Sequence, residues 1–334
     1  MRKLGIGATE GWLLVAILFM GAALSLLAPA FLTLSNLFDL LNASSINIIF
    51  GIGLLVVLIA GGIDISFAVA ASVVQYLTAL TLQRLGGGDW TTGLLLAAAF
   101  GTLLGCFNAF WIYQFRIVSV VVTIATYNLF FGLLMYFSGG VSLYDLPDWL
   151  TTRITIVSLE TANGRAEITI LVVVTVICVA ATWMLLRRTS TGRQLYAMGD
   201  NVEGARRIGI SLAAMHYLAF GWLGFMSGIA GLMQAHYAQE IVPNALYGRE
   251  LDVLAAVVLG GARLGGGRGT ILGVLLGILL VAMTQNGLNL LGISPYAFKM
   301  IIGAIILVAI TLSSEGVGRF IGSWRAPIRQ RAAP

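Results

Sequence analysis

Charged side chains are scarce in this sequence. Only 10% of its 334 residues are Asp, Glu, Lys or Arg, whereas 59% are hydrophobic. A soluble domain carries roughly 25% charged residues. The few charges are also segregated, which leaves several uncharged runs as long as the ~20 residues that cross a bilayer core of about 30 Å. The scarcity of charge therefore excludes an ordinary soluble domain and indicates an integral membrane protein.

Lysine, cysteine and histidine are also rare. With two lysines and no Gly-x-x-x-x-Gly-Lys-[Ser/Thr] segment, the chain has no P-loop for the phosphates of ATP. The glycine-rich stretch 265–269 contains no lysine and is interpreted as a tight turn. Cys106 and Cys178 lie within apolar runs and cannot form a disulfide framework. His216 and His236 belong to no cluster with metal-ligand spacing, so neither a metal nor a cofactor is expected.

Ten apolar runs divide the chain, and each is continuous rather than alternating, which favours helices over a β-barrel. We predict an all-α, polytopic membrane helical bundle of about ten transmembrane helices, with residues 1–334 as a single domain. The first run follows Arg2 and Lys3 as a secretory signal would, but we interpret it as an uncleaved helix because more spans follow. The predicted spans are residues 12–31, 46–62, 67–83, 93–113, 118–138, 168–186, 215–235, 251–261, 269–287 and 296–313, of which the eighth is short.

The distribution of Lys and Arg predicts the orientation of these spans. If the N-terminus lies inside and the spans alternate, fourteen Lys and Arg residues fall in inner segments and four fall in outer segments, namely Arg84, Arg153, Arg165 and Arg249. This positive-inside bias places both termini in the cytoplasm. It also accounts for the net charge of +5 without a nucleic-acid partner. Residues 139–167 then form a periplasmic loop, and residues 187–214 form a basic cytoplasmic loop.

Ionisable residues are nearly absent from the predicted spans. Asp64 and Lys299 lie within or at the edge of one, and Asp252 lies in the short eighth span. A proton-coupled carrier usually needs a relay of Asp, Glu or His, and a membrane-embedded enzyme needs a catalytic dyad or a metal cluster. The sequence shows neither pattern, so the energy for any active transport must come from another subunit.

Three separated motifs resemble those of one family. Residues 192–210 read GRQLYAMGDNVEGARRIGI and closely resemble the cytoplasmic coupling loop of the ribose-type ABC importer permeases. Members of that family take up monosaccharides and the related signalling molecule autoinducer-2. The other two matches run from Ser45 to the GGIDIS segment at residues 61–66, and from Glu250 through GGRGT at residues 266–270 to Asn289.

The resemblance implies that the basic loop couples the chain to an ATPase. The coupling residues on this basis are Gly199, Asn201, Glu203, Ala205, Arg206 and Gly209. The residues themselves predict a short helix that Asn201 caps, with Glu203 in its first turn and Arg206 near its end, where the helix dipole favours these charges. Gly209 is the expected stop. Without the resemblance, a loop that only sets orientation would explain the segment equally well.

A break in the second apolar run is the candidate for a gate. Gly61 and Gly62 weaken the helix, and Asp64 and Ser66 can satisfy the backbone groups that the break frees. A plain turn between two helices, with Asp64 as a cap, remains an equal alternative. Among the polar residues within spans, Asn47, Asn108 and Asn286 are the candidates for the translocation path, although interhelical hydrogen bonds are an alternative role for each of them.

The resemblance implies a permease subunit of an ATP-driven importer in the bacterial inner membrane, for a monosaccharide or a related sugar-like solute. Its expected partners are a second permease subunit, identical or not, two ATP-binding subunits and a periplasmic solute-binding protein. One alternative is an ion-coupled secondary carrier. Another is a branched-chain amino acid ABC permease, although a zwitterionic substrate would favour a helix terminus or paired charges along the path, and the sequence shows neither.

Overall fold

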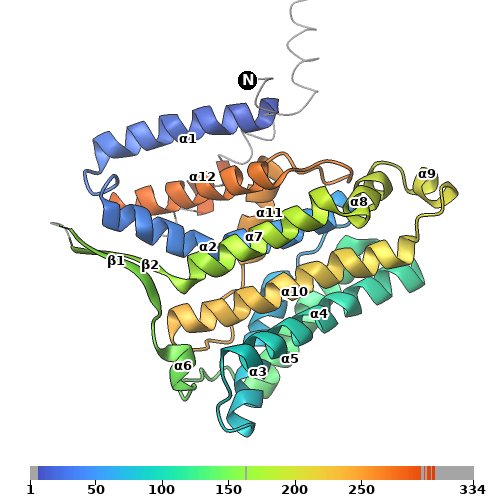
Figure 1. The fold of residues 1–334 in the computed structure, drawn as a ribbon, viewed down its shortest axis with the longest axis horizontal. Coiled ribbons are helices and arrows are strands. Elements are labelled where there is room, and N and C mark those ends of the chain that lie inside the picture. The colour runs from blue at the N-terminus through green and yellow to red at the C-terminus, as the bar shows by residue number, and fades with distance from the viewer. Residues whose placement is uncertain (1–6, 162–163, 295–296, 298, 302, 305–334) are drawn as a thin grey trace, which may run out of the picture.

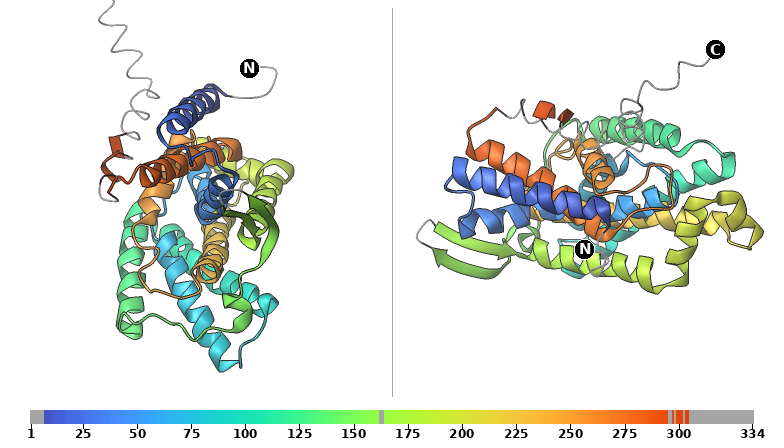
Figure 2. Two further views of the ribbon diagram at one scale, coloured as in Figure 1. Left: turned by 90° about the vertical axis from the view of Figure 1, so that its left-hand side faces the viewer. Right: turned by 90° about the horizontal axis from the view of Figure 1, so that it is seen from above.

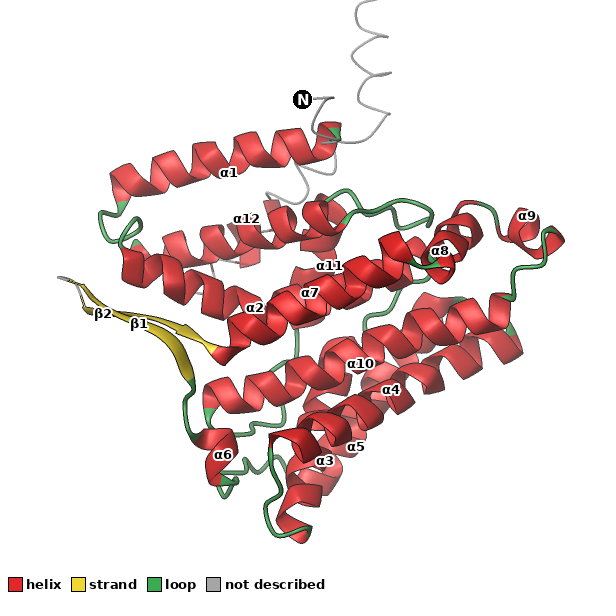
Figure 3. Ribbon diagram, viewed as in Figure 1, coloured by secondary structure: helices red, strands yellow, loops and turns green. Residues whose placement is uncertain are grey.

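The structure is a bundle of long helices that lie roughly side by side along one direction (Figures 1 and 3). It is a computed structural model that describes residues 7–161, 164–294, 297, 299–301 and 303–304. The long helices are α1 (Ala8–Leu27), α2 (Leu34–Ile59), α3 (Phe67–Arg84), α4 (Trp90–Phe115), α5 (Ser119–Ser138), α7 (Ile170–Arg188), α10 (Leu212–Ala238) and α12 (Ile271–Leu290). The shorter elements are α6 (Asp148–Thr151), α8 (Ser190–Asp200), α9 (Val202–Arg207), α11 (Arg249–Leu259), and strands β1 (Thr155–Thr161) and β2 (Gly164–Thr169).

Seven helices in the described ranges are long and apolar enough to cross a membrane, namely α1, α2, α4, α5, α7, α10 and α12. This confirms a mostly helical, polytopic membrane protein, while the count of ten spans and the side on which the termini lie stay predictions. The short eighth span corresponds to α11, whose 11 residues measure about 16 Å and cannot cross the bilayer alone. Most of the predicted tenth span, 296–313, lies outside the described residues, as do Arg2, Lys3 and the C-terminal arginines.

Helix α2 forms the centre of the bundle (Figure 2, left). It packs against α7, α10, α11 and α12, and its residues from Ile49 to Ile59 are all buried. The predicted span 46–62 covers only the later part of this helix, because α2 already starts at Leu34, where Thr33 caps it by accepting a hydrogen bond from the Asn36 backbone. The polar residues of its first turns gave that stretch the composition of a loop.

Helices α4 and α10 pack with their backbones in contact. A Cβ atom on Gly101 of α4 would overlap the carbonyl oxygen of Gly224 on α10, and a Cβ atom on Gly224 would overlap that of Gly101. Small residues at such a seam allow the close approach that drives helix association in a bilayer.

One element departs from the all-α prediction. The predicted loop 139–167 holds α6 and most of an antiparallel hairpin, β1–β2, with Leu159 opposite Ala166. Asn42 of α2 anchors this hairpin, because its amide donates to the Glu167 carbonyl at 2.7 Å and accepts from the Thr169 backbone at 3.1 Å. The hairpin depends on this distant contact, which helical periodicity does not predict.

The two ends of the bundle differ in charge. The hairpin and α6 lie at one end, and α8 and α9 lie at the other (Figure 1). Arg84, Arg153 and Arg165 belong to the hairpin end, where Gln83 contacts the loop before α6. The arginines at or near the α8–α9 end are Arg116, Arg187, Arg188, Arg193, Arg206, Arg207, Arg263 and Arg268. The α8–α9 end is therefore the one that the positive-inside rule predicts to be cytoplasmic.

Candidate functional site

The predicted coupling helix is present as α9. The Asn201 side chain accepts a hydrogen bond from the Gly204 backbone at 2.8 Å, which caps α9 where α8 ends. Glu203 in the first turn and Arg206 in the last turn form an exposed ion pair at 2.6 Å. Gly209 ends the helix with a φ of 85°, and the next backbone amide returns to the Ala205 carbonyl at 3.1 Å. The local structure predicted for this segment is confirmed, and its role stays a prediction.

Gly199 joins α8 to two other segments. A Cβ atom at this position would overlap the carbonyl oxygen of Ile59, at the end of α2, and the backbone nitrogen of Gly267, in the loop between α11 and α12. The Gly267 amide donates to the same Ile59 carbonyl at 2.9 Å. Gly266 has a φ of 88°, and a Cβ atom there would lie 2.9 Å from the Cα atoms of both Gly199 and Gly61. We call residues 59–62, 199 and 266–269 the glycine junction.

Tyr196 of α8 forms a hydrogen bond to the glycine junction. Its hydroxyl donates to the Gly269 carbonyl at 2.8 Å. Burial raises the pKa of the Tyr196 hydroxyl, and the nearby Arg187 lowers it in part, so the phenol stays protonated at neutral pH and keeps this donor. Tyr196 and Gly199 thus connect α8 to the end of α2 and to the loop between α11 and α12.

The helix break at residues 61–66 is held by buried polar groups. The Asp64 carboxylate, 2% exposed, accepts from the Ser66 backbone at 2.6 Å and from the Ser66 hydroxyl at 2.7 Å. The Asn108 amide of α4 donates to the Asp64 carboxylate at 3.1 Å and to the Ser66 hydroxyl at 2.8 Å. The prediction that polar side chains satisfy freed backbone groups is confirmed for Asp64, which accepts from the Ser66 backbone, whereas the Ser66 hydroxyl bonds the Asp64 and Asn108 side chains instead. The break is thus fixed to α4 by a polar network in an apolar bundle.

A crevice of about 930 Å³ lies between the break and the coupling helix. Gly61 and Gly62 contribute to its lining from one side, and Glu203 and Arg206 contribute from α9. Arg116, which follows α4, and His216 of α10 also line it. The coupling residues and the break therefore border one space at the α8–α9 end.

Asn47 and Asn286 lie elsewhere. Asn286 of α12 forms a reciprocal amide pair with Asn36 of α2, at 2.9 and 3.0 Å, which is the interhelical alternative stated for it above. Asn47 is half-buried on α2, and its side-chain oxygen has no hydrogen-bond partner among the described residues. Of the three predicted path asparagines, the structure brings only Asn108 to the break.

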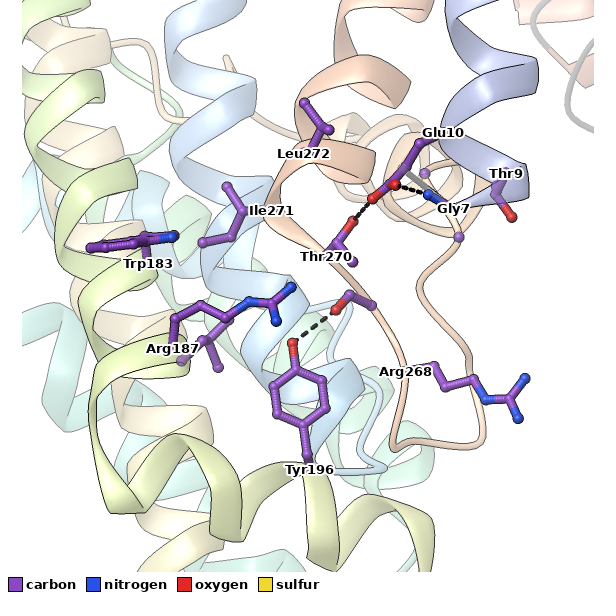
Figure 4. Close-up of a pocket in the computed structure, with 14 residues that line it drawn as sticks. Gly7, Thr9, Glu10, Trp183, Arg187, Tyr196, Arg268, Thr270, Ile271 and Leu272 are labelled. Atoms are coloured by element: carbon purple, nitrogen blue, oxygen red, sulfur yellow. Dashed lines mark hydrogen bonds between the residues drawn. The ribbon is translucent and has the colours of Figure 1, made fainter. Parts of the chain in front are cut away.

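A second cavity of about 510 Å³ lies at the same end, between α1, α7, α8 and α12 (Figure 4). Glu10 of α1 lies in its wall and joins two elements, because its carboxylate accepts from the Gly7 backbone and from the Thr270 hydroxyl that caps α12. Figure 4 shows Arg187 and Tyr196 directed toward the loop before α12, whereas the guanidinium of Arg268 points away from them. The described residues include no group of His, Cys, Asp and Glu that would hold a metal ion.

Sequence reasoning missed one cluster, at the start of α11. Glu250 appears in the sequence only as part of a motif, but in the structure it is buried, at 3% exposed. Arg249 and Asp252 are charged neighbours of it in the first turn of α11. Tyr127 of α5 and Tyr247, two residues before α11, lie against each other with ring centroids 5.5 Å apart. The available signal was a charged triplet at the start of an apolar run too short to span the bilayer. Paired charges at a helix terminus, which the sequence did not show along a path, are therefore present in the fold.

These features define a class of protein. A polytopic helical membrane bundle, with an exposed, capped helix pair fixed to its interior by a backbone junction, has the features expected of the membrane subunit of a transporter. Comparison with known proteins gives the family. Residues 36–310 match the family described as "Branched-chain amino acid transport system / permease component", and the chain belongs to this permease family.

Several relatives are similar along most of their length. The ribose import permease protein of Escherichia coli (strain K12) is 30% identical over 91% of this chain and 94% of its own length. That of Bacillus subtilis (strain 168) is 31% identical over 87% and 88%, respectively. The autoinducer 2 import system permease protein of Yersinia pestis (strain Pestoides F) is 30% identical over 89% and 82%. No solved structure matches the chain. The protein is a permease subunit of the inner membrane, and ATP hydrolysis belongs to a separate subunit.

Proposed function

We propose that this chain conducts a monosaccharide or a related sugar-like solute into the cytoplasm, as the pore subunit of an ATP-driven importer. The observation that carries the proposal is the similarity, over about nine-tenths of the chain, to import permeases for ribose and autoinducer 2. A galactose/methyl galactoside import permease is 26% identical over 91% of the chain. The proposed assembly contains a second permease subunit, two ATP-binding subunits and a periplasmic solute-binding protein.

The coupling role is assigned to α8 and α9. An ATP-binding subunit would contact α9 through its exposed Glu203–Arg206 pair and displace α8. The glycine junction would then transmit the displacement to residues 61–66, where the Asp64–Asn108 network holds the break. This chain of contacts supports a gate at the break over a plain turn, because a plain turn needs neither the junction nor a buried carboxylate.

Uptake by the reconstituted transporter tests this function. Proteoliposomes holding the permease, its ATP-binding subunits and its solute-binding protein would be offered radiolabelled D-ribose, D-galactose and L-leucine. We expect ATP-dependent uptake of at least one of the sugars and no uptake of leucine. Uptake of leucine alone would refute the proposed solute class.

Leucine is the required comparison for a specific reason. Arg249, Glu250 and Asp252 at the start of α11 are the paired charges that a zwitterionic substrate would need. The family description also names branched-chain amino acid transport. The sugar permeases among the relatives outweigh both observations, because they are similar along the whole fold.

The double variant Gly199→Asp, Arg206→Glu tests the coupling role. We expect it to insert into the membrane and to abolish uptake, because it disrupts the junction and places a like charge beside Glu203. Wild-type uptake by this variant would refute the assignment of α8 and α9.

A further inference from the structure

The cavity of about 510 Å³ between α1, α7, α8 and α12 is separate from the crevice that α9 borders, and the two share no lining residue (Figure 4). Small-molecule sites commonly measure about 300–1,000 Å³, so the cavity has room for a ligand group. Trp183 of α7 and Leu272 of α12 line it and are 44% and 45% exposed. The cavity is therefore open to the surroundings of the subunit.

The end of α7 shows the depth at which the cavity lies. The exposed residues of α7 are all hydrophobic until its last turn, where Arg187 and Arg188 follow. Trp183 lies one turn earlier, and the Arg188 guanidinium is 5.0 Å from the centroid of its ring. Tryptophan is enriched where a membrane meets water, and arginine is enriched on the cytoplasmic side. The cavity thus lies at the level of the lipid headgroups, in the leaflet that the positive-inside rule predicts to be cytoplasmic.

Lipid borders this part of the subunit. Helix α1 lies at the outside of the bundle (Figure 2, left), and its exposed residues from Trp12 to Leu27 are all apolar. The exposed part of α7 is equally apolar up to Met184. The two helices that form opposite sides of the cavity therefore both present surfaces that suit lipid chains, and a lipid against either of them has its headgroup beside the cavity.

Positive charge predominates in the lining. Figure 4 shows Arg187 directed across the cavity toward the loop before α12, and it forms no ion pair with an acidic residue in the part of the chain that the structure describes. Arg268 lines the same cavity, and its exposed guanidinium adds charge at the rim. The acidic residue in the lining is Glu10, whose two carboxylate oxygens already accept from the Gly7 backbone at 2.6 Å and from the Thr270 hydroxyl at 2.5 Å. Arg187 is therefore the charged group that is left to bind a ligand.

We infer that this cavity binds the phosphate group of an anionic phospholipid, with Arg187 as the direct contact and Trp183 beside the headgroup. A guanidinium presents paired N–H donors that match two oxygens of a phosphate. Basic pockets between membrane helices on the cytoplasmic side suit anionic headgroups. The inference rests on the cytoplasmic placement of the α8–α9 end and is independent of the transported solute. Because Tyr196 of α8 also lines the cavity, the bound lipid would lie beside the glycine junction.

The test measures thermal unfolding of the full-length chain in neutral detergent, titrated with phosphatidylglycerol or with zwitterionic phosphatidylcholine. A ligand that binds the folded state raises the melting temperature with its concentration, which gives an apparent Kd. The variant is Arg187→Gln, and the matched control is Arg193→Gln, because Arg193 is an exposed arginine on α8 that does not line the cavity. We expect phosphatidylglycerol to stabilise the wild type and Arg193→Gln equally. Its Kd should rise about tenfold for Arg187→Gln, the scale of one hydrogen bond to a charged group.

Three outcomes would overturn the inference. Equal stabilisation of the wild type by the two lipids would exclude a site for anionic lipid, and this comparison needs no variant. Equal Kd values for Arg187→Gln and Arg193→Gln would exclude Arg187 as the contact, and unfolding without added lipid shows whether both variants are folded. Displacement of phosphatidylglycerol by millimolar inorganic phosphate would assign the cavity to a free anion instead of a lipid. No transport is measured, so failure here leaves the proposed function intact.

Discussion

Replacement of Gly199 by alanine should uncouple the cytoplasmic helices from the bundle. The new Cβ atom would overlap the Ile59 carbonyl oxygen and the Gly267 nitrogen, and both are backbone atoms that no side-chain rotation can move. Overpacking of this kind costs about 1–3 kcal/mol. Loss of the hydrogen bond from Gly267 to Ile59 adds about 1 kcal/mol. The total of about 2–4 kcal/mol would raise the ratio of junctions with these backbone contacts broken to junctions with them intact roughly 30- to 700-fold.

The same loop provides a matched control. Gly265 has an ordinary backbone conformation, and a Cβ atom there would meet nothing closer than the Arg263 side chain at 3.8 Å. ATP-driven uptake in proteoliposomes should therefore fall at least tenfold for Gly199→Ala and stay unchanged for Gly265→Ala. Thermal unfolding in detergent would show whether Gly199→Ala remains folded. If Gly199→Ala transports as well as Gly265→Ala, the junction does not carry the coupling.

Three further substitutions test the polar contacts. Asn108→Leu deprives the buried Asp64 carboxylate of a donor and should lower the stability by about 1–3 kcal/mol; an unchanged melting temperature would contradict this. Asn201→Ala removes the cap of α9 at a cost of about 1 kcal/mol and should reduce uptake, whereas Asn201→Asp should restore it; equal uptake by both variants would disprove the capping role. Asn42→Ala should speed hydrogen exchange at Thr169 about tenfold, since the loss of about 1.4 kcal/mol is the scale of one buried hydrogen bond; unaltered exchange would show that Asn42 does not anchor the hairpin.

Much of the helical framework follows from the sequence, because long apolar runs translate directly into spanning helices. The short helix α9 can also be predicted from the sequence, because its capping and charged residues each act on backbone groups within a few residues. These residues are Asn201, Glu203, Arg206 and Gly209. Helix α2 begins before the predicted span, and its start is hard to predict because partly buried polar side chains there pair with distant partners, as Asn36 does with Asn286. The hairpin was missed for a similar reason, since Asn42 holds it from another element.

The site itself divides in the same way. Asp64 and Ser66 stand out locally because they interrupt an apolar run after two glycines. The glycine junction unites segments that lie far apart in the chain, and Tyr127 of α5 lies against Tyr247, in a turn about 120 residues later. Periodicity and spacing describe one segment at a time, so they could identify the members of these groups without showing that they meet.

If α8 and α9 receive the driving force from an ATP-binding subunit, this polypeptide cannot accumulate a solute by itself. Vesicles reconstituted with this polypeptide alone, under an imposed proton or sodium gradient, test it most directly. Internal D-ribose and D-galactose should never exceed their external concentrations, and accumulation should appear only when the ATP-binding subunits, the solute-binding protein and ATP are added. Uphill accumulation by the polypeptide alone would contradict it.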